Sequence, residues 1–289
     1  MRFRHVDVFA ERPLAGNGTV VFFGGVSRPA GELQALTQEM RQFESVFVEP
    51  RSGAAEHSID ARIFSLVEEL AFAGHPLLGA AAALHEAQAD AERARWEFHL
   101  GDRIVAIESS KSDCHYVVSM DQGRPAFGAS PEPDLRRALL SALNIDASLL
   151  VGEPQVVSTG LRYLIVAVSG GLERARISDP SFESLLAEAG AQYAYVVDVR
   201  RREGRHWEND GSIEDVATGS AAGPVGSWLV RNRLAEPNER IVLRQGRFLD
   251  RPSALFVEVH GGPEEIERVD VAGPVALVAG GELDFELGG

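Results

Sequence analysis

The strongest constraint on the fold is an internal repeat, because two segments that begin 145 positions apart, at residues 69 and 214, share one pattern. Residues 69–75 read ELAFAGH, and residues 214–220 read EDVATGS. Each segment follows a strand-rich stretch and opens a helix that is poor in charge. Upstream, residues 44–48 (ESVFV) have a loose counterpart in residues 193–197 (YAYVV). The repeat predicts two similar domains, each with a sheet wrapped around one buried helix.

The hydrophobic pattern predicts an α+β fold. Short segments that alternate apolar with polar residues recur along the chain, as half-buried strands do. Helices are predicted over residues 29–39, 75–88, 132–143, 181–189 and 225–232. The second of these helices is nearly all apolar, so we expect it to be buried on all sides.

The length of 289 residues is sufficient for two domains. A turn-rich stretch at residues 121–125 predicts a boundary between residues 1–123 and 124–289. A C-terminal strand near residues 270–289 can return to the first domain.

Charge and composition exclude several classes of protein. The formal net charge is −15, and no basic footprint for nucleic acid is visible. The N-terminus has no apolar signal core, and no run of about 18 apolar residues could cross a membrane. We therefore expect a cytoplasmic protein. The single cysteine, Cys114, excludes disulfides and cysteine-based zinc sites within the chain, and we expect it to be a buried structural thiol.

The first repeat segment ends on Gly74-His75-Pro76. Because Pro favours the first position of a helix, we expect the helix to begin at Pro76, with His75 at or beside its N-cap. The N–H groups and dipole of a helix start favour an anion, and His75 could add a hydrogen bond or a positive charge. The alternative is a core helix that happens to begin with His.

The second repeat segment carries Asp215, Gly219 and Ser220. Its alternative interpretation is a routine loop in which Ser220 caps a helix. Taken together, the two helix starts, one in each domain, could face each other across a cleft and bind a carboxylate through their main-chain amides.

Glu44 and Asn17 are two further candidate positions. Glu44 lies between a predicted helix and an apolar strand, where it is either a surface residue or a base whose pKa is raised by an apolar cleft. Asn17, in Gly16-Asn17-Gly18, reads as a hairpin turn between two strands. The sequence alone does not choose between a structural and a catalytic role for Glu44.

The order and spacing of these motifs resemble the PhzF-like family of phenazine biosynthesis. The resemblance covers essentially the whole chain, and its blocks are residues 6–9 (VDVF), 16–17 (GN), 44–48 (ESVFV), 72–79 (FAGHPLLG), 158–160 (STG), 214–221 (EDVATGSA) and 245–253 (QGRFLDRPS).

This resemblance implies a fold similar to diaminopimelate epimerase, in which two pseudo-symmetric halves each wrap an antiparallel sheet around a central helix. It implies an active site between the halves, a homodimer, and isomerisation of dihydro-3-hydroxyanthranilate without metal or organic cofactor. By position, Glu44 matches the catalytic acid/base. The other matching site residues are His75, Asp215 and Ser220, which are polar, Gly74 and Gly219, whose amides hold the substrate, and Asn17, in the matching Gly-Asn pair.

The sequence departs from the family pattern at three places. Val216 and Gly18 stand where proline is common. Pro224 lies about one turn inside the helix that the second repeat segment opens at Ala221, so that helix could instead begin at Pro224. The thiols of the related epimerases are replaced by Ala73 and Thr218, so two-thiol racemisation is excluded.

We therefore expect an isomerase in which Glu44 moves a proton on a small carboxylate substrate. A racemase or epimerase acting through Glu44 and Asp215 is the first alternative. A metabolite-binding protein without catalysis is the second. The sequence does not identify the substrate.

Overall fold

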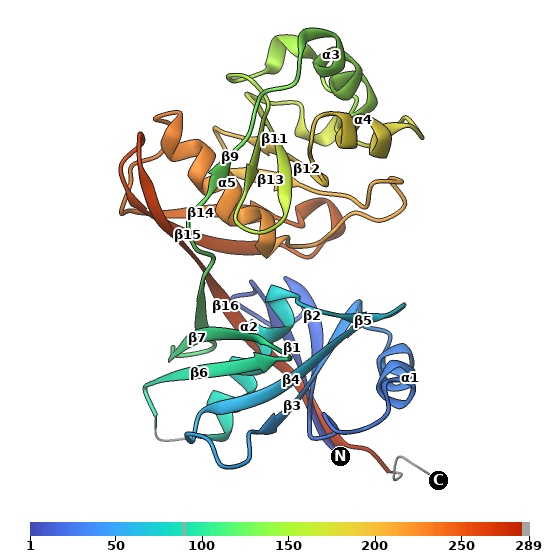
Figure 1. Cartoon of the computed structure of the whole chain (residues 1–289), viewed down its shortest axis with the longest axis vertical. Helices are drawn as coiled ribbons and strands as arrows, with labels where there is room; N and C mark the ends of the chain where they lie inside the picture. Colours follow the sequence, from blue (N-terminus) through green and yellow to red (C-terminus); the bar gives the residue numbers. More distant parts are fainter. Residues whose placement is uncertain (89–90, 285–289) are drawn as a thin grey trace. The chain divides into compact units, whose positions relative to one another are not determined.

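The computed structural model describes residues 1–88 and 91–284, and the chain divides into two compact units (Figure 1). The first unit comprises Met1–Met120 and the segment from Ala272 onward, and the second comprises Asp121–Val271. The boundary falls beside the turn-rich stretch at residues 121–125. The last strand begins in the second unit and continues into the first.

The first unit is a sheet built around one helix. Its strands follow the order β16-β1-β2-β3-β4-β6-β7-β8, and β16 also neighbours β8. Along this order from β16 to β8, successive strands are antiparallel except β2–β3 and β4–β6. Its elements are β1 (Arg2–Val8), β2 (Asn17–Phe23), α1 (Ala30–Met40), β3 (Glu44–Pro50), β4 (Ser58–Ser65), β5 (Glu69–Leu70), α2 (Gly74–Ala87), β6 (Arg93–Leu100), β7 (Arg103–Lys111), β8 (Tyr116–Asp121) and β16 (Ile266–Glu282).

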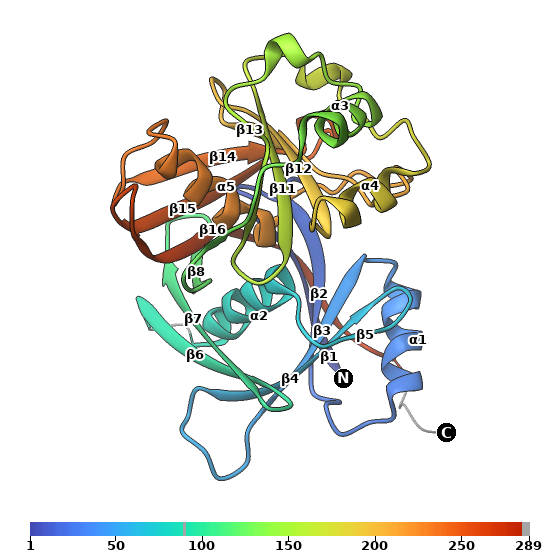
Figure 2. The ribbon, with the colours of Figure 1, turned by 45° about the horizontal axis from the view of Figure 1, so that its top comes forward.

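Helix α2 is the centre of this unit. It contacts two groups of strands in the sheet around it, β1, β2 and β3 in one group and β6 and β7 in the other (Figure 2). Its residues from Pro76 to Ala83 are all buried, as expected of an apolar helix. Helix α1 covers the outer face through an apolar cluster in which Phe22 and Phe47 stack at 4.7 Å.

The second unit repeats this plan with α5 as its central helix. Its strands follow the order β16-β15-β14-β13-β12-β11-β10-β9. Helix α5 contacts β10, β11, β12 and β15. Its elements are β9 (Ala126–Phe127), α3 (Pro133–Ala142), β10 (Gln155–Ser158), β11 (Arg162–Val168), α4 (Phe182–Glu188), β12 (Tyr193–Asp198), β13 (Glu203–Arg205), α5 (Gly219–Arg231), β14 (Arg240–Gln245), β15 (Ser253–Gly261) and the 3-10 helices η1 (Ala147–Leu149), η2 (Leu172–Arg174) and η3 (Arg247–Leu249).

The internal repeat reappears in the structure. Helices α2 and α5 begin at Gly74 and Gly219, which keeps the spacing of the repeat. Strand β3 runs parallel to β2 with Glu44 beside Thr19, and β12 runs parallel to β11 with Tyr193 beside Tyr163. The predicted α+β fold is therefore confirmed.

Two predicted helix starts are wrong. Helix α2 begins at Gly74 rather than at Pro76. Helix α5 begins at Gly219 and accommodates Pro224 in its interior, although proline cannot donate the hydrogen bond expected there. Residues 221–230 of α5 are all buried, so packing outweighs the local preference against proline.

Cys114 also differs from expectation, because its side chain is exposed. Strands β7 and β8 pair from Lys111 with Tyr116, so the residues between them form the turn. A turn lies at the surface, and the prediction of a buried thiol is therefore wrong.

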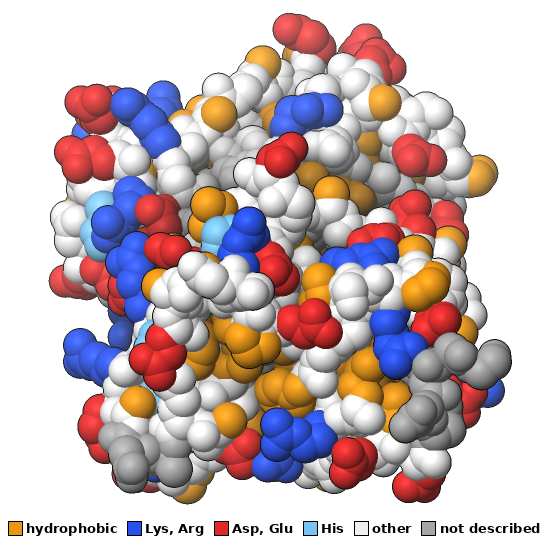
Figure 3. Space-filling view, turned by 60° about the horizontal axis from the view of Figure 1, so that its bottom comes forward, with side chains coloured by type: hydrophobic (Ala, Val, Ile, Leu, Met, Phe, Trp, Pro, Cys, Tyr) orange, Lys and Arg blue, Asp and Glu red, His pale blue; other side chains and the backbone are white. Residues whose placement is uncertain are grey.

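The described residues contain no helix that is long and apolar enough to span a membrane. Figure 3 shows acidic and basic side chains interspersed on one face, with no continuous basic surface over the residues drawn there.

Candidate active site

Glu44 and His75 meet in the first unit. Strand β3 begins at Glu44, whose carbonyl oxygen accepts a hydrogen bond of 2.9 Å from the Thr19 hydroxyl on β2. The His75 Nδ1 atom lies 3.4 Å from Glu44 Oε2, and the two side chains are 12% and 22% exposed. Glu44 is therefore a largely buried carboxylate beside an imidazole, rather than a surface residue at a strand start.

The two ring nitrogens of His75 differ in their surroundings. The Nε2 atom is buried, and within residues 1–88 and 91–284 it meets no hydrogen-bond partner. Since an ionised carboxylate only accepts hydrogen bonds, Nδ1 carries the hydrogen when it faces ionised Glu44. A neutral His75 then presents Nε2 as an acceptor, and a protonated His75 presents it as a donor.

Gly74 and Asn17 occupy the same unit. A Cβ atom on Gly74 would lie 3.4 Å from the Met120 Cε atom, an ordinary contact. Asn17 is the first residue of β2, is 8% exposed and pairs with Val8, so the hairpin-turn interpretation is wrong. The turn precedes it and uses Gly16, whose φ of +60° suits glycine.

Asp215 lies in the loop before α5 in the second unit. Its Oδ2 atom accepts a hydrogen bond of 2.6 Å from the Thr218 hydroxyl, and its Oδ1 atom accepts one of 3.3 Å from the Ala217 N–H. The carbonyl of Val216, at the position where proline is common, accepts a hydrogen bond from the Ser253 hydroxyl. The bonds from Thr218 and Ala217 thus orient the carboxylate, whereas the bond from Ser253 reaches only the main chain of the loop.

Ser220 does not cap α5, because the N-cap is Thr218 and Ser220 is the second helical residue. The Ser220 hydroxyl instead lies 2.7 Å from the Tyr163 hydroxyl. Burial raises the pKa of Tyr163, so the phenol stays neutral well above physiological pH. The carbonyl of Gly219 accepts a hydrogen bond of 2.9 Å from the Gln122 amide.

The starts of α2 and α5 share two properties that favour anions. Among the described residues, neither N-cap makes a side-chain capping bond, and neither first turn contains an acid. The first N–H groups of a helix lack partners within the helix, and its dipole attracts negative charge there. His75 and Ser220 are each the second residue of their helix, so each polar side chain lies beside such a start.

Sequence reasoning missed the aromatic and amide side chains behind Ser220 and Asp215. The rings of Tyr163, Tyr193 and His206 contact one another at centroid distances of 5.5 to 5.7 Å. The Gln245 amide donates hydrogen bonds to the Asp215 carbonyl and to the Thr218 hydroxyl. The signal for Gln245 was present, because the residue opens the block at 245–253, but no local pattern assigned it a partner.

Glu214 has a structural partner. It forms a two-pronged ion pair with Arg205, at 2.8 and 2.5 Å, and both side chains are 10% exposed. Arg205 also donates to two main-chain carbonyls and stacks on Trp207. This ion pair anchors the loop that carries Asp215.

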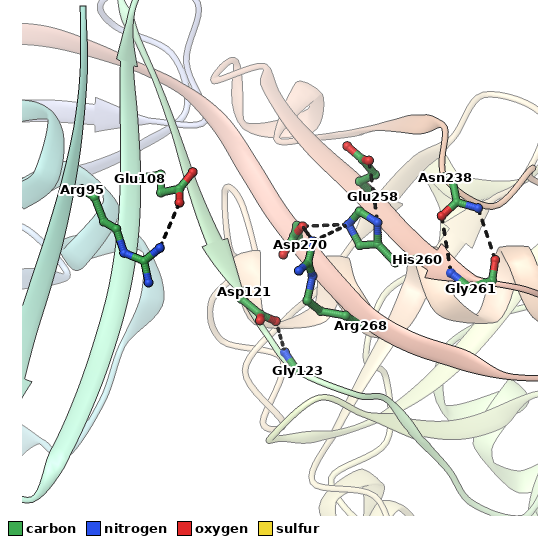
Figure 4. A network of polar contacts seen from close by, with 10 residues as sticks. All are labelled: Arg95, Glu108, Asp121, Gly123, Asn238, Glu258, His260, Gly261, Arg268 and Asp270. Carbon is green, nitrogen blue, oxygen red and sulfur yellow. Dashed lines mark hydrogen bonds and ion pairs between the residues drawn. The ribbon is translucent and has the colours of Figure 1, made fainter.

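Another ionisable cluster lies on β15 and β16 (Figure 4). His260 Nε2 is 2.7 Å from Asp270 Oδ2, and Arg268 donates to the same oxygen at 2.9 Å. These side chains are partly exposed, and none belongs to the predicted site. Within the part of the chain that the structure describes, no three His, Cys, Asp or Glu side chains gather to hold a metal ion.

Comparison with known proteins identifies the family. Residues 6–281 match the family described as phenazine biosynthesis-like proteins. The chain belongs to this family. The trans-2,3-dihydro-3-hydroxyanthranilate isomerase of Pseudomonas fluorescens is 34% identical over 281 residues, which cover 93% of this chain and 94% of that protein.

Solved structures agree with this assignment. A predicted epimerase from Pseudomonas aeruginosa is 46% identical, with a TM-score of 0.89 and 99% of each chain covered. A phenazine biosynthesis protein of the PhzF family from Bacillus anthracis shares the fold at 22% identity, with a TM-score of 0.82 and 99% of each chain covered. Membership in the PhzF family and the prediction of an isomerase are therefore confirmed, and these relatives give no support to a non-catalytic binding protein.

Proposed function

We propose that this PhzF-family isomerase moves a proton on a small carboxylate-bearing substrate by general acid/base catalysis, with Glu44 as the group that removes and returns the proton. The observation that carries the proposal is the contact of 3.4 Å between Glu44 Oε2 and His75 Nδ1 at the start of α2. Both side chains are largely buried, which keeps bulk water away from the atoms that would exchange the proton.

In the proposed reaction, Glu44 removes a proton from one carbon of the substrate and returns it to another, so no atom is gained or lost. His75 hydrogen-bonds the substrate through Nε2 and steadies the Glu44 carboxylate through Nδ1. General acid/base catalysis contributes about 10²–10⁴-fold, so positioning by the surrounding main chain must supply the rest. The reaction uses only side chains and main-chain amides, without metal or organic cofactor.

The remaining site residues bind and orient. We assign carboxylate recognition to the main-chain amides at the starts of α2 and α5, near Gly74 and Gly219, because uncapped helix starts bind anions. Ser220 assists that recognition, Asn17 contacts the substrate, and Asp215 orients a substrate amine or hydroxyl. The working form of the enzyme in this proposal is a homodimer.

The substrate to test first is trans-2,3-dihydro-3-hydroxyanthranilate, because relatives 34% identical to this chain carry that name. It bears the required carboxylate together with an amine and a hydroxyl. A panel of related aromatic and amino-acid-derived carboxylates, screened by thermal shift, extends the search. A ligand at 100 times its dissociation constant stabilises its protein by about 2.7 kcal/mol.

The test replaces Glu44 by Gln, which keeps the shape and removes the titratable group. We expect E44Q to bind the substrate normally and to lose at least about 100-fold in kcat. Glu49→Gln is the matched control, since Glu49 lies on the same strand and bonds the main chain of Gly25 instead. A near-normal rate in E44Q would show that another group is the base.

An epimerase is the second candidate, because the structure 46% identical to this chain is described as a predicted epimerase. Turnover in deuterium oxide separates the two reactions. An epimerase inverts one carbon without moving a double bond, and any deuterium that it incorporates is on that carbon. The proposed isomerase shifts a double bond, and any deuterium that it incorporates is on a different carbon from the one that lost the proton. Mass spectrometry and NMR of the recovered substrate and product identify the labelled carbon.

A further inference from the structure

Gln245 packs against the loop that carries Asp215. It is the last residue of β14 and is 1% exposed. The next residue, Gly246, has a φ of +81°, and a Cβ there would lie 2.8 Å from the carbonyl oxygen of Val216 and closer still to that of Arg251. Only glycine fits this turn without strain, and the close approach brings the strand end against the loop.

The Gln245 side chain makes four hydrogen bonds, and their chemistry allows only one orientation of its amide. Its Nε2 atom donates to the Asp215 carbonyl at 2.8 Å and to the Thr218 hydroxyl oxygen at 3.0 Å. Its Oε1 atom accepts from the Thr218 N–H at 3.1 Å and from the Tyr195 hydroxyl at 3.0 Å. A flipped amide would place Oε1 against the Asp215 carbonyl, acceptor against acceptor.

This arrangement determines where the Thr218 hydroxyl hydrogen points. The hydroxyl oxygen accepts from Gln245, so its own hydrogen is directed to Asp215 Oδ2, 2.6 Å away. The Ala217 N–H donates to the other carboxylate oxygen. A buried amide thus controls the orientation of an ionisable side chain through one intervening hydroxyl.

We propose that Gln245 is a positioning residue for Asp215, acting through Thr218 to hold the carboxylate in the orientation that the substrate requires. This inference rests on the role of Asp215 in the proposed function. It gives Gln245 no contact with the substrate. It predicts that the amide of Gln245, and not merely the volume of its side chain, is needed for turnover.

The test compares three variants in the full-length protein. Gln245→Met keeps the length of the side chain and removes all four hydrogen bonds. Gln245→Glu replaces the donating amide by a carboxylate oxygen, which can accept the Thr218 hydroxyl hydrogen in place of Asp215. Ser253→Ala is the matched control, because Ser253 is 5% exposed and bonds the same loop at the Val216 carbonyl.

With trans-2,3-dihydro-3-hydroxyanthranilate as substrate, we expect kcat to fall about 10- to 100-fold in both Gln245 variants and KM to change little, since small misplacements of a reacting group carry such costs. Ser253→Ala should keep the wild-type kcat. Thr218→Val should reproduce the loss, and the Gln245→Met/Thr218→Val double variant should lose no more than either single variant. Equal rates in Gln245→Met and wild type, or additive losses in the double variant, would overturn the inference.

A crystal structure of Gln245→Met gives a readout that does not depend on the substrate. The inference requires the contact between Thr218 Oγ1 and Asp215 Oδ2 to be lost or rearranged, and an unchanged contact contradicts it. Asp215→Asn separates this inference from the proposed function. If Asp215→Asn leaves kcat unchanged, Asp215 has no catalytic role; if it lowers kcat while Gln245→Met does not, only the positioning role fails.

Discussion

Replacing Gly79 by Ala should destabilise the first unit, although alanine is the better helix former. Gly79 lies in the buried part of α2, against β1 and β2. A Cβ atom at this position would lie 2.8 Å from the Cγ2 atoms of Thr19 and Val6, and 3.3 Å from that of Val8. These side chains are β-branched and stiff, so the helix or the strands must move.

The expected size of the effect follows from two opposing contributions. Overpacking of a well-packed core costs about 1–3 kcal/mol. Alanine recovers about 0.8–1.0 kcal/mol relative to glycine in a helix interior. Because two of the contacts are as short as 2.8 Å, the cost should lie in the upper part of its range, and the free energy of unfolding should fall by roughly 1–2 kcal/mol. Urea unfolding followed by circular dichroism measures the change.

Gly31→Ala is the matched control in α1. No atom lies within 4 Å of the position where its Cβ would be, and Gly31 is exposed. The same substitution should therefore raise the free energy of unfolding, by up to about 0.5–1 kcal/mol. Opposite signs for the two glycines are the result that the structure requires.

The Gly79→Ala variant should also lose activity. Thr19, which the new methyl group would displace, donates its hydroxyl to the Glu44 carbonyl. A shift of Thr19 therefore changes the distance between Glu44 and His75. A Gly79→Ala protein that is as stable as the wild type would refute the close packing of α2 on β1 and β2 and, with it, the expected displacement of Thr19.

Two further predictions concern stability. Glu214→Gln should lower the free energy of unfolding by about 3 kcal/mol, because it leaves the buried guanidinium of Arg205 without its anion. Glu265→Gln is the control, since Glu265 forms an exposed pair with Arg124, and it should change the free energy of unfolding by less than about 1 kcal/mol. Urea unfolding compares the two variants. Burial raises the pKa of Tyr163 and Tyr195 above the unfolded value near 10. Their contribution to stability should therefore be constant through neutral pH and fall once the pH exceeds about 10, where the unfolded chain ionises first. The slope should reach about 1.4 kcal/mol per pH unit for each tyrosine, and Tyr163→Phe should remove its share; an unchanged slope would contradict the role of burial.

The sequence by itself determined the plan of the molecule and its family. The repeat located both central helices, because a glycine followed by a run of small apolar residues is a local pattern. The repeat segments contain His75 and Asp215, whereas the role of Glu44 came from the resemblance to the family. The predicted placement of one active site between the halves, and the homodimer, remain predictions of the resemblance.

The tertiary structure decided which side chains meet. Tyr163 and Ser220 are 57 positions apart, and Gln245 and Thr218 are 27 apart, so no local pattern could pair them. The position of Pro224 inside α5 and the tight enclosure of Gly79 likewise depend on packing against elements that are distant in the sequence. Hydrophobic periodicity shows which face of an element is buried, but the partner across that face depends on the register of strands and helices, and only the folded chain establishes that register.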